Sequence, residues 1–133
     1  MLASRRMLNW RRPTNLGAKD GRLAPCRRTP NCVSSQADPL DKEHYIAPIA
    51  YAGGIAELRK ALETLPLATV VHEEADYLYA EFRTPILRFV DDVEFLKRDD
   101  VLHVRSASRL GRRDFKANRN RVEQLRAFLK QQP

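Results

Sequence analysis

Between residues 68 and 106, apolar and polar side chains alternate in the pattern typical of β-strands. On the second of these strands, Leu78 and Phe82 lie on one face, whereas Tyr79 and Glu81 lie on the other. Short polar turns separate the strands, so neighbours along the chain should pair in antiparallel fashion as a meander. The four predicted strands are Ala68–Glu73, Tyr77–Arg83, Phe89–Lys97 and Val101–Ser106.

Two other segments have apolar residues at helical spacing. The first predicted helix begins at Gly53-Gly54 and ends before Pro66, because proline restricts the residue that precedes it. The second covers about Ala117–Gln131, and the side chain of Asp114 or Asn118 can cap its N-terminus. Both helices have one apolar stripe and one polar face, as helices packed on a sheet require.

A further short strand is expected within His44–Tyr51, at a sheet edge because Pro48 lacks the N–H that a central strand needs. The element order is then (β)-α-β-β-β-β-α. The simplest arrangement is an α+β fold: a curved antiparallel meander of four to five strands, with two helices packed on one face.

The pairing of the last two predicted strands follows if Arg98-Asp99 forms a two-residue turn. Val93 then faces Val104 and Asp92 faces Arg105, so that apolar residues meet on one face and opposite charges on the other. A shift by one residue would place Val93 opposite Arg105 and scatter this pattern. The sequence therefore predicts that Asp92 and Arg105 are cross-strand partners.

The positive charge is concentrated near the N-terminus. The 133 residues fit one domain, and contents of 43% hydrophobic and 31% charged residues are typical of a soluble globular protein. Residues 1–30 hold eight basic residues and one acidic residue, whereas residues 31–133 hold 16 of each, so the early residues account for the net charge of +7. We expect a flexible basic arm over residues 1–22 and a single α+β domain over residues 23–131.

The basic arm suits an acidic partner such as nucleic acid, anionic lipid or protein, but it is equally typical of a solubilising tail. Its single aromatic residue, Trp10, offers little support for base stacking, and the rest of the chain lacks a nucleic-acid-binding signature. No apolar run approaches the ~20 residues of a membrane span. Without a recognisable export signal, the expected location is the cytoplasm.

The two cysteines, Cys26 and Cys32, allow either one disulfide or two thiols. A reducing cytosol favours thiols. A structural metal needs about four ligands, and the three histidines have no paired spacing that would complete a set with the cysteines. We therefore expect neither a metal site nor a cofactor.

A second polar block, residues 105–122, is rich in arginine and ends in the last predicted helix. An anion near the start of that helix would meet both guanidinium groups and free backbone N–H groups. The alternative needs no ligand: Arg105 pairs with Asp92, Asp114 and Asn118 cap the helix, and the other charges face solvent.

Several motifs, in the same order, resemble the family known as domain of unknown function 1499 over roughly residues 20–130. The resemblance implies a single compact domain of bacterial or plastid type, with no settled activity. It also implies a small residue, often glycine, where this chain has Lys116. The motifs are Pro25-Cys26, Thr29–Gln36, Phe89–Phe95, Arg105–Arg109, Gly111, Asp114, Asn118, Arg119, Arg121 and Val122.

The function expected from these blocks is binding rather than catalysis. Nucleophile-elbow, P-loop, dinucleotide-binding and zinc-protease motifs are absent from the sequence. We expect an accessory domain that binds a small polar or anionic ligand, or a protein partner. The alternatives are a purely structural interaction domain, and a thiol-dependent enzyme or redox protein that uses Cys26 and Cys32 with His103 or His72 as a base. The candidate binding residues are Cys32, Asp92, Arg105, Arg109, Asp114, Asn118 and Arg121.

Overall fold

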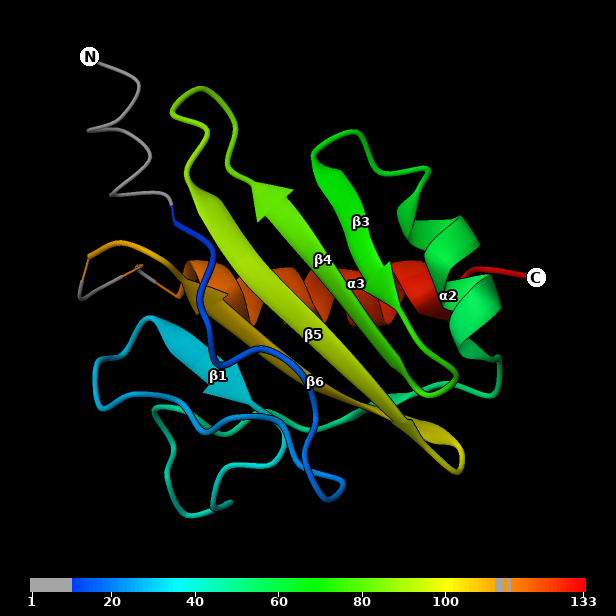
Figure 1. Ribbon diagram of the computed structural model, residues 1–133, viewed down its shortest axis with the longest axis horizontal. Coiled ribbons are helices and arrows are strands. Elements are labelled where there is room, and N and C mark those ends of the chain that lie inside the picture. The colour runs from blue at the N-terminus through cyan, green and yellow to red at the C-terminus, as the bar shows by residue number, and fades with distance from the viewer. Residues whose placement is uncertain (1–10, 112–113, 115) are drawn as a thin grey trace.

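The computed structural model of the chain describes residues 11–111, 114 and 116–133. One antiparallel sheet carries both helices on one face (Figure 1). The α+β class is confirmed, with six strands among the described residues instead of four to five. The elements are β1 (Cys32–Ser34), β2 (Ile49–Ala50), α2 (Ile55–Leu62), β3 (Ala68–Glu73), β4 (Tyr77–Arg83), β5 (Val90–Arg98), β6 (Val101–Ser108) and α3 (Ala117–Lys130).

The sheet has the order β1-β6-β5-β4-β3, and β2 also pairs with β6. The two short strands share the outer edge of β6. Cys32 of β1 lies opposite Ala107 near the end of β6, and Ile49 of β2 lies opposite Leu102 near its start. The edge strand expected within His44–Tyr51 is therefore reduced to two residues.

The hydrophobic core lies between the sheet and the helices. Leu78 of β4 and Phe95 of β5 point toward Leu58 of α2 and Val122 of α3, and all four side chains are fully buried. Burial of a side chain of this size contributes about 1.5–3 kcal/mol. The alternation predicted for β4 is thus correct, because its even-numbered residues face the helices.

The other face of the sheet is also covered. The early chain crosses it (dark blue in Figure 1), and Leu16 and Leu23 pack against Tyr77, Tyr79 and Leu96. Residues 11–22, which the sequence assigned to a flexible arm, contact the sheet in this way. The first ten residues of the expected arm lie outside the described residues.

The predicted pairing of β5 with β6 is wrong by two residues. The two-residue turn is Asp99-Asp100, and Asp99 has a positive φ of 51° that aspartate tolerates better than most residues. Glu94 therefore lies opposite Arg105, and Asp92 lies opposite Ala107. Because side chains alternate with a period of two, the shift leaves every side chain on its predicted face.

Within the described residues, neither helix has both the length and the hydropathy needed to cross a bilayer.

Candidate functional site

The two polar blocks meet at the edge of the sheet. β1 brings Cys32 beside Ala107 and Ser34 opposite Arg105. Cys32 forms a disulfide with Cys26, whose Cα lies 5.7 Å from its own, and no free cysteine remains in the described chain. Of the two states that the sequence allows, the structure has the disulfide. Such bonds are more common in oxidising compartments, and the cytoplasmic location stays a prediction.

A cavity of about 370 Å³ opens between the cysteine-containing segment and the ends of β5 and β6. Four of the seven candidate residues from the sequence line it: Cys32, Asp92, Arg105 and Arg109. Two arginines outside the candidate set, Arg11 and Arg27, line it as well. Four guanidinium groups thus face a cavity whose lining contains one carboxylate.

Arg109 bridges two carboxylates on the floor of this cavity. Glu81 and Asp92 lie directly opposite each other on β4 and β5. Arg109 donates from Nε and Nη2 to both oxygens of Asp92, each at 2.9 Å, and from Nη2 to Glu81 Oε2 at 2.6 Å. Tyr79 and Arg12 also donate to Glu81. Two like charges that would repel each other are therefore held together by shared cations.

Arg105 is much less well satisfied. Its residue is 5% exposed, and its Nη1 lies 3.7 Å from Oε1 of Glu94, which is 0% exposed. Nη2 reaches the Pro25 carbonyl oxygen at 3.4 Å. Among the described residues, neither Arg105 Nε nor Glu94 Oε1 has a hydrogen-bond partner. Unpaired buried polar atoms are rare, and they call for an explanation such as a bound ligand.

The titration behaviour of these groups follows from burial. Burial raises the pKa of Glu94, although hydrogen bonds from Tyr77 and the Gly17 N–H favour its ionised form. Burial lowers the pKa of Arg105; Glu94 opposes this shift, whereas the nearby charge of Arg27 adds to it. Arginine remains charged at neutral pH even so. Arg105 and Arg27 are thus close enough to repel each other.

The remaining three candidate residues, Asp114, Asn118 and Arg121, lie on the other side of the sheet. Asp91 points toward the helices and pairs with Arg121 at 2.7 Å. Asn118 is fully buried and accepts a hydrogen bond of 2.6 Å from Ser106 Oγ. Asp114 accepts hydrogen bonds from the Asn118 backbone N–H at 3.0 Å and side-chain amide at 2.7 Å, which confirms its capping role. These groups join α3 to the sheet and do not face the cavity.

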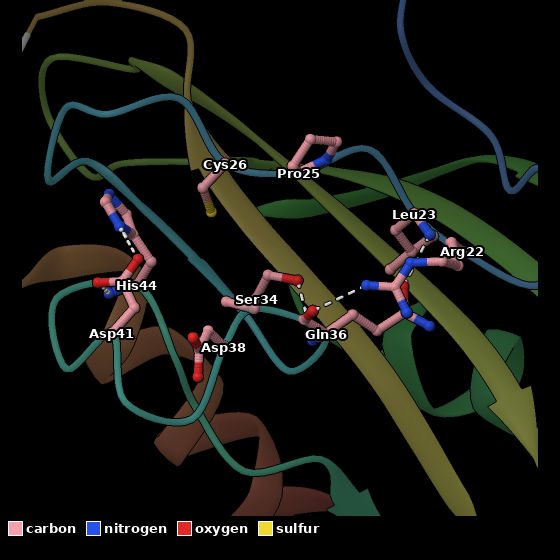
Figure 2. Close-up of a pocket in the computed structure, with 10 residues that line it drawn as sticks. Arg22, Leu23, Pro25, Cys26, Ser34, Gln36, Asp38, Asp41 and His44 are labelled. Atoms are coloured by element: carbon pink, nitrogen blue, oxygen red, sulfur yellow. Dashed lines mark hydrogen bonds and ion pairs between the residues drawn. The ribbon is translucent and has the colours of Figure 1, made fainter.

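A second cavity, of about 390 Å³, lies on the other side of the disulfide and is lined by Cys26, His44 and Asp41 (Figure 2). His44 Nδ1 lies 2.8 Å from Asp41 Oδ2, and its Nε2 lies 2.9 Å from the Thr29 carbonyl oxygen. Burial lowers the pKa of His44, but the Thr29 carbonyl and Asp41 outweigh it, so the net shift is upward. Both ring nitrogens are engaged, and His44 ties two loops together.

The histidines proposed as a base for a cysteine nucleophile are engaged elsewhere. His103 Nδ1 lies 3.0 Å from Ser35 Oγ, and His72 Nε2 lies 2.7 Å from Glu74. Neither lines the cavity that contains Cys26 or the one that contains Cys32.

Sequence reasoning missed the groups that complete the arginine-lined cavity. Arg11 and Arg27 were counted among the basic residues of the first 30 positions and were not assigned to an anion site. Glu94 lies opposite Arg105, a position that the predicted pairing gave to Asp92. The sequence did contain one relevant signal. The prolines and glycines of the early segment are typical of irregular chain, and such a segment can lie across the surface of the domain.

Comparison with known proteins gives one match. The family model described as a protein of unknown function (DUF1499) matches residues 22–129. No curated protein and no solved structure matched the chain. The match covers most of the chain and confirms the resemblance noted from its motifs. The chain belongs to the DUF1499 family of proteins of unknown function.

Proposed function

We propose that the chain is a binding domain for a small anion carrying a carboxylate or phosphate group, held in the arginine-lined cavity. The observation that carries this proposal is Arg105, a buried guanidinium whose Nε has no hydrogen-bond partner in the described chain. Arg105 lines the cavity, and a shift of its buried side chain toward an anion there would give that donor a partner. Arginine suits this role because its planar fork matches carboxylate and phosphate geometry.

The charge distribution supports an anion over a neutral ligand. Among the described residues of the lining, Asp92 is the one acidic side chain, and Arg109 donates to both its oxygens. Arg11 and Arg27 are exposed and contribute further positive charge. An anion between Arg27 and Arg105 would replace a repulsion with two attractions.

The size and construction of the cavity also fit a small ligand. Its volume of about 370 Å³ falls at the lower end of the range of about 300–1,000 Å³ for small-molecule sites. The disulfide fixes one wall, and the network of Arg109, Asp92 and Glu81 fixes the floor. Such a preorganised site binds with little loss of side-chain freedom. Among the described residues that line it there is no histidine, the commonest general base, so the proposal is binding without catalysis.

Titration calorimetry with inorganic phosphate and with citrate tests this proposal. We expect saturable binding to the native protein, and at least about tenfold weaker binding for Arg27→Ala. The matched control is Arg28→Ala, which removes an equally exposed neighbouring arginine that does not line the cavity. Equal affinities for the two variants would refute the site, and absence of binding to the native protein would refute the function.

A second candidate function is reversible disulfide chemistry at Cys26 and Cys32. The observation that favours it is the half-buried position of Cys26 on the wall of a cavity. A dithiol reductant would supply two electrons and two protons and would leave two thiols, with Cys26 the more accessible sulfur. Alkylation after graded treatment with dithiothreitol tests it. Rapid labelling of Cys26 under mild reduction would support a redox role, whereas a bond that resists reduction until the protein unfolds would exclude one.

A further inference from the structure

The connection between β4 and β5 exposes apolar side chains to solvent. It runs from Thr84 to Phe89 at one end of the sheet (Figure 1). Ile86 is 94% exposed and Leu87 is 66% exposed. Apolar residues this exposed and adjacent to each other are typical of an interaction site, whereas single exposed residues are common.

The loop has a defined shape. The Thr84 N–H donates to the Phe89 carbonyl oxygen at 2.8 Å, and the Arg88 N–H donates to the Thr84 carbonyl oxygen at 3.0 Å. Ile86 and Arg88 have positive φ angles of 68° and 60°. Such angles are strained, above all for a β-branched residue, and strain of this kind is concentrated at functional segments. The loop therefore holds its apolar side chains outward at a cost in free energy.

The charge around the loop is positive. Arg88 is exposed and Arg83 is half-exposed, with Glu81 Oε1 3.9 Å from Arg83 Nη2; no acidic residue occurs in the sequence between Phe82 and Val90. The early chain adds Arg11 at the same end of the sheet, since its neighbour Arg12 bonds to Glu81 on β4.

We propose that this loop, Thr84–Phe89, docks the protein onto an anionic lipid bilayer. Ile86 and Leu87 enter the boundary between headgroups and acyl chains, while Arg83 and Arg88 lie at the level of the lipid phosphates. The loop is a narrow, convex tip, and a fluid bilayer accepts such a tip without a matching pocket. The flanking arginines are complementary to the negative potential of the bilayer surface. Neither Ile86 nor Leu87 lines the anion cavity.

Co-sedimentation of the full-length protein with vesicles tests the proposal. The probes are vesicles of phosphatidylcholine alone and of phosphatidylcholine mixed with phosphatidylserine. We expect binding to the mixed vesicles that weakens as salt is raised, and at least about tenfold weaker binding for the double variant Ile86→Ser, Leu87→Ser. The control is Leu40→Ser, which removes an 86% exposed apolar side chain elsewhere and should bind like the native protein.

Each alternative gives a distinct result. Unchanged binding of the double variant would assign membrane binding to the basic early residues and overturn the proposal. Equal binding to neutral and mixed vesicles would overturn the role of the arginines. Absence of binding to any vesicle would overturn the proposal as a whole. A native dimer in sedimentation velocity that the double variant abolishes would assign the loop to self-association instead. Both substitutions are at exposed positions, so circular dichroism should report an unchanged fold.

Discussion

Replacing Arg109 with methionine should destabilise the protein strongly. Arg109 is the shared partner of Glu81 and Asp92, which lie opposite each other on β4 and β5. Methionine fills a similar volume but neutralises neither carboxylate. Two buried negative charges would then face each other with fewer donors.

The size of the effect follows from burial. The side chains of Arg109, Glu81 and Asp92 are 7%, 7% and 2% exposed. Removing one partner of a buried ion pair costs about 3–5 kcal/mol, because the other charge is left buried without a counter-ion. The remaining donors to the two carboxylates, Arg12 and Tyr79, place the expected loss toward the lower end, at about 3 kcal/mol.

Urea unfolding followed by circular dichroism measures this difference. The control is Arg59→Met, which breaks two ion pairs at the surface. Arg59 is 32% exposed, and its partners Glu63 and Glu73 are 54% and 34% exposed, so the substitution should cost about 1 kcal/mol or less. Adding Asp92→Asn to the Arg109→Met variant should restore part of the loss, because it removes one unpaired charge. A loss below about 1 kcal/mol for Arg109→Met, or no recovery in the double variant, would refute the reasoning.

The stability of the Arg109→Met variant should also depend on pH differently from that of the native protein. Burial raises the pKa of Glu81, but hydrogen bonds from Arg12, Tyr79 and Arg109 outweigh it and hold the pKa below the ordinary 4.5. The ionised group therefore stabilises the native state above that value, and this contribution is lost as the pH falls through the lowered pKa. Without Arg109, the ionised Glu81 carboxylate contributes less to the stability of the native state. The difference in stability between the two proteins should therefore stay constant at higher pH and narrow as the pH falls below 4.5, and a difference that does not narrow there would contradict this account.

Two further predictions concern the backbone around the site. Replacing Cys26 and Cys32 with serine should lower the free energy of unfolding by about 2 kcal/mol in chemical denaturation, since the disulfide closes a short loop in the unfolded chain; unchanged stability would contradict this. Lys116 precedes α3 with a positive φ of 66°, so Lys116→Gly should raise the melting temperature, with a gain of about 0.5–1 kcal/mol. A lower melting temperature for Lys116→Gly would contradict the left-handed backbone conformation at this position.

The sequence predicts most of the sheet because its strands alternate clearly. β3 and β4 have the predicted bounds, and α3 ends one residue earlier than expected. The turn between β5 and β6 was misassigned because Arg98-Asp99 and Asp99-Asp100 satisfy the face pattern equally well. The two registers differ by two residues, and a shift of two exchanges partners but not faces.

The candidate site could be predicted only in part, for a related reason. Asp91 and Asp92 are neighbours in sequence but point to opposite faces of β5, one toward Arg121 and the other toward Arg109. A cluster of polar residues in sequence therefore forms two separate networks in space. The burial of the polar face was also not predictable from strand patterns, because an irregular segment with little intrinsic structure covers Tyr77 and Tyr79.

The most direct test of an anion site is the NMR signal of Arg105 Nε. It can be followed in ¹H–¹⁵N spectra and assigned with Arg105→Lys. On titration with inorganic phosphate, we expect the Arg105 Nε–H to shift in a saturable manner, because the anion supplies the hydrogen bond it lacks. The Nε–H of Arg126, which donates to Glu123 on the far surface, should not move. An Arg105 signal that phosphate leaves unchanged would contradict the assignment of this cavity to anion binding.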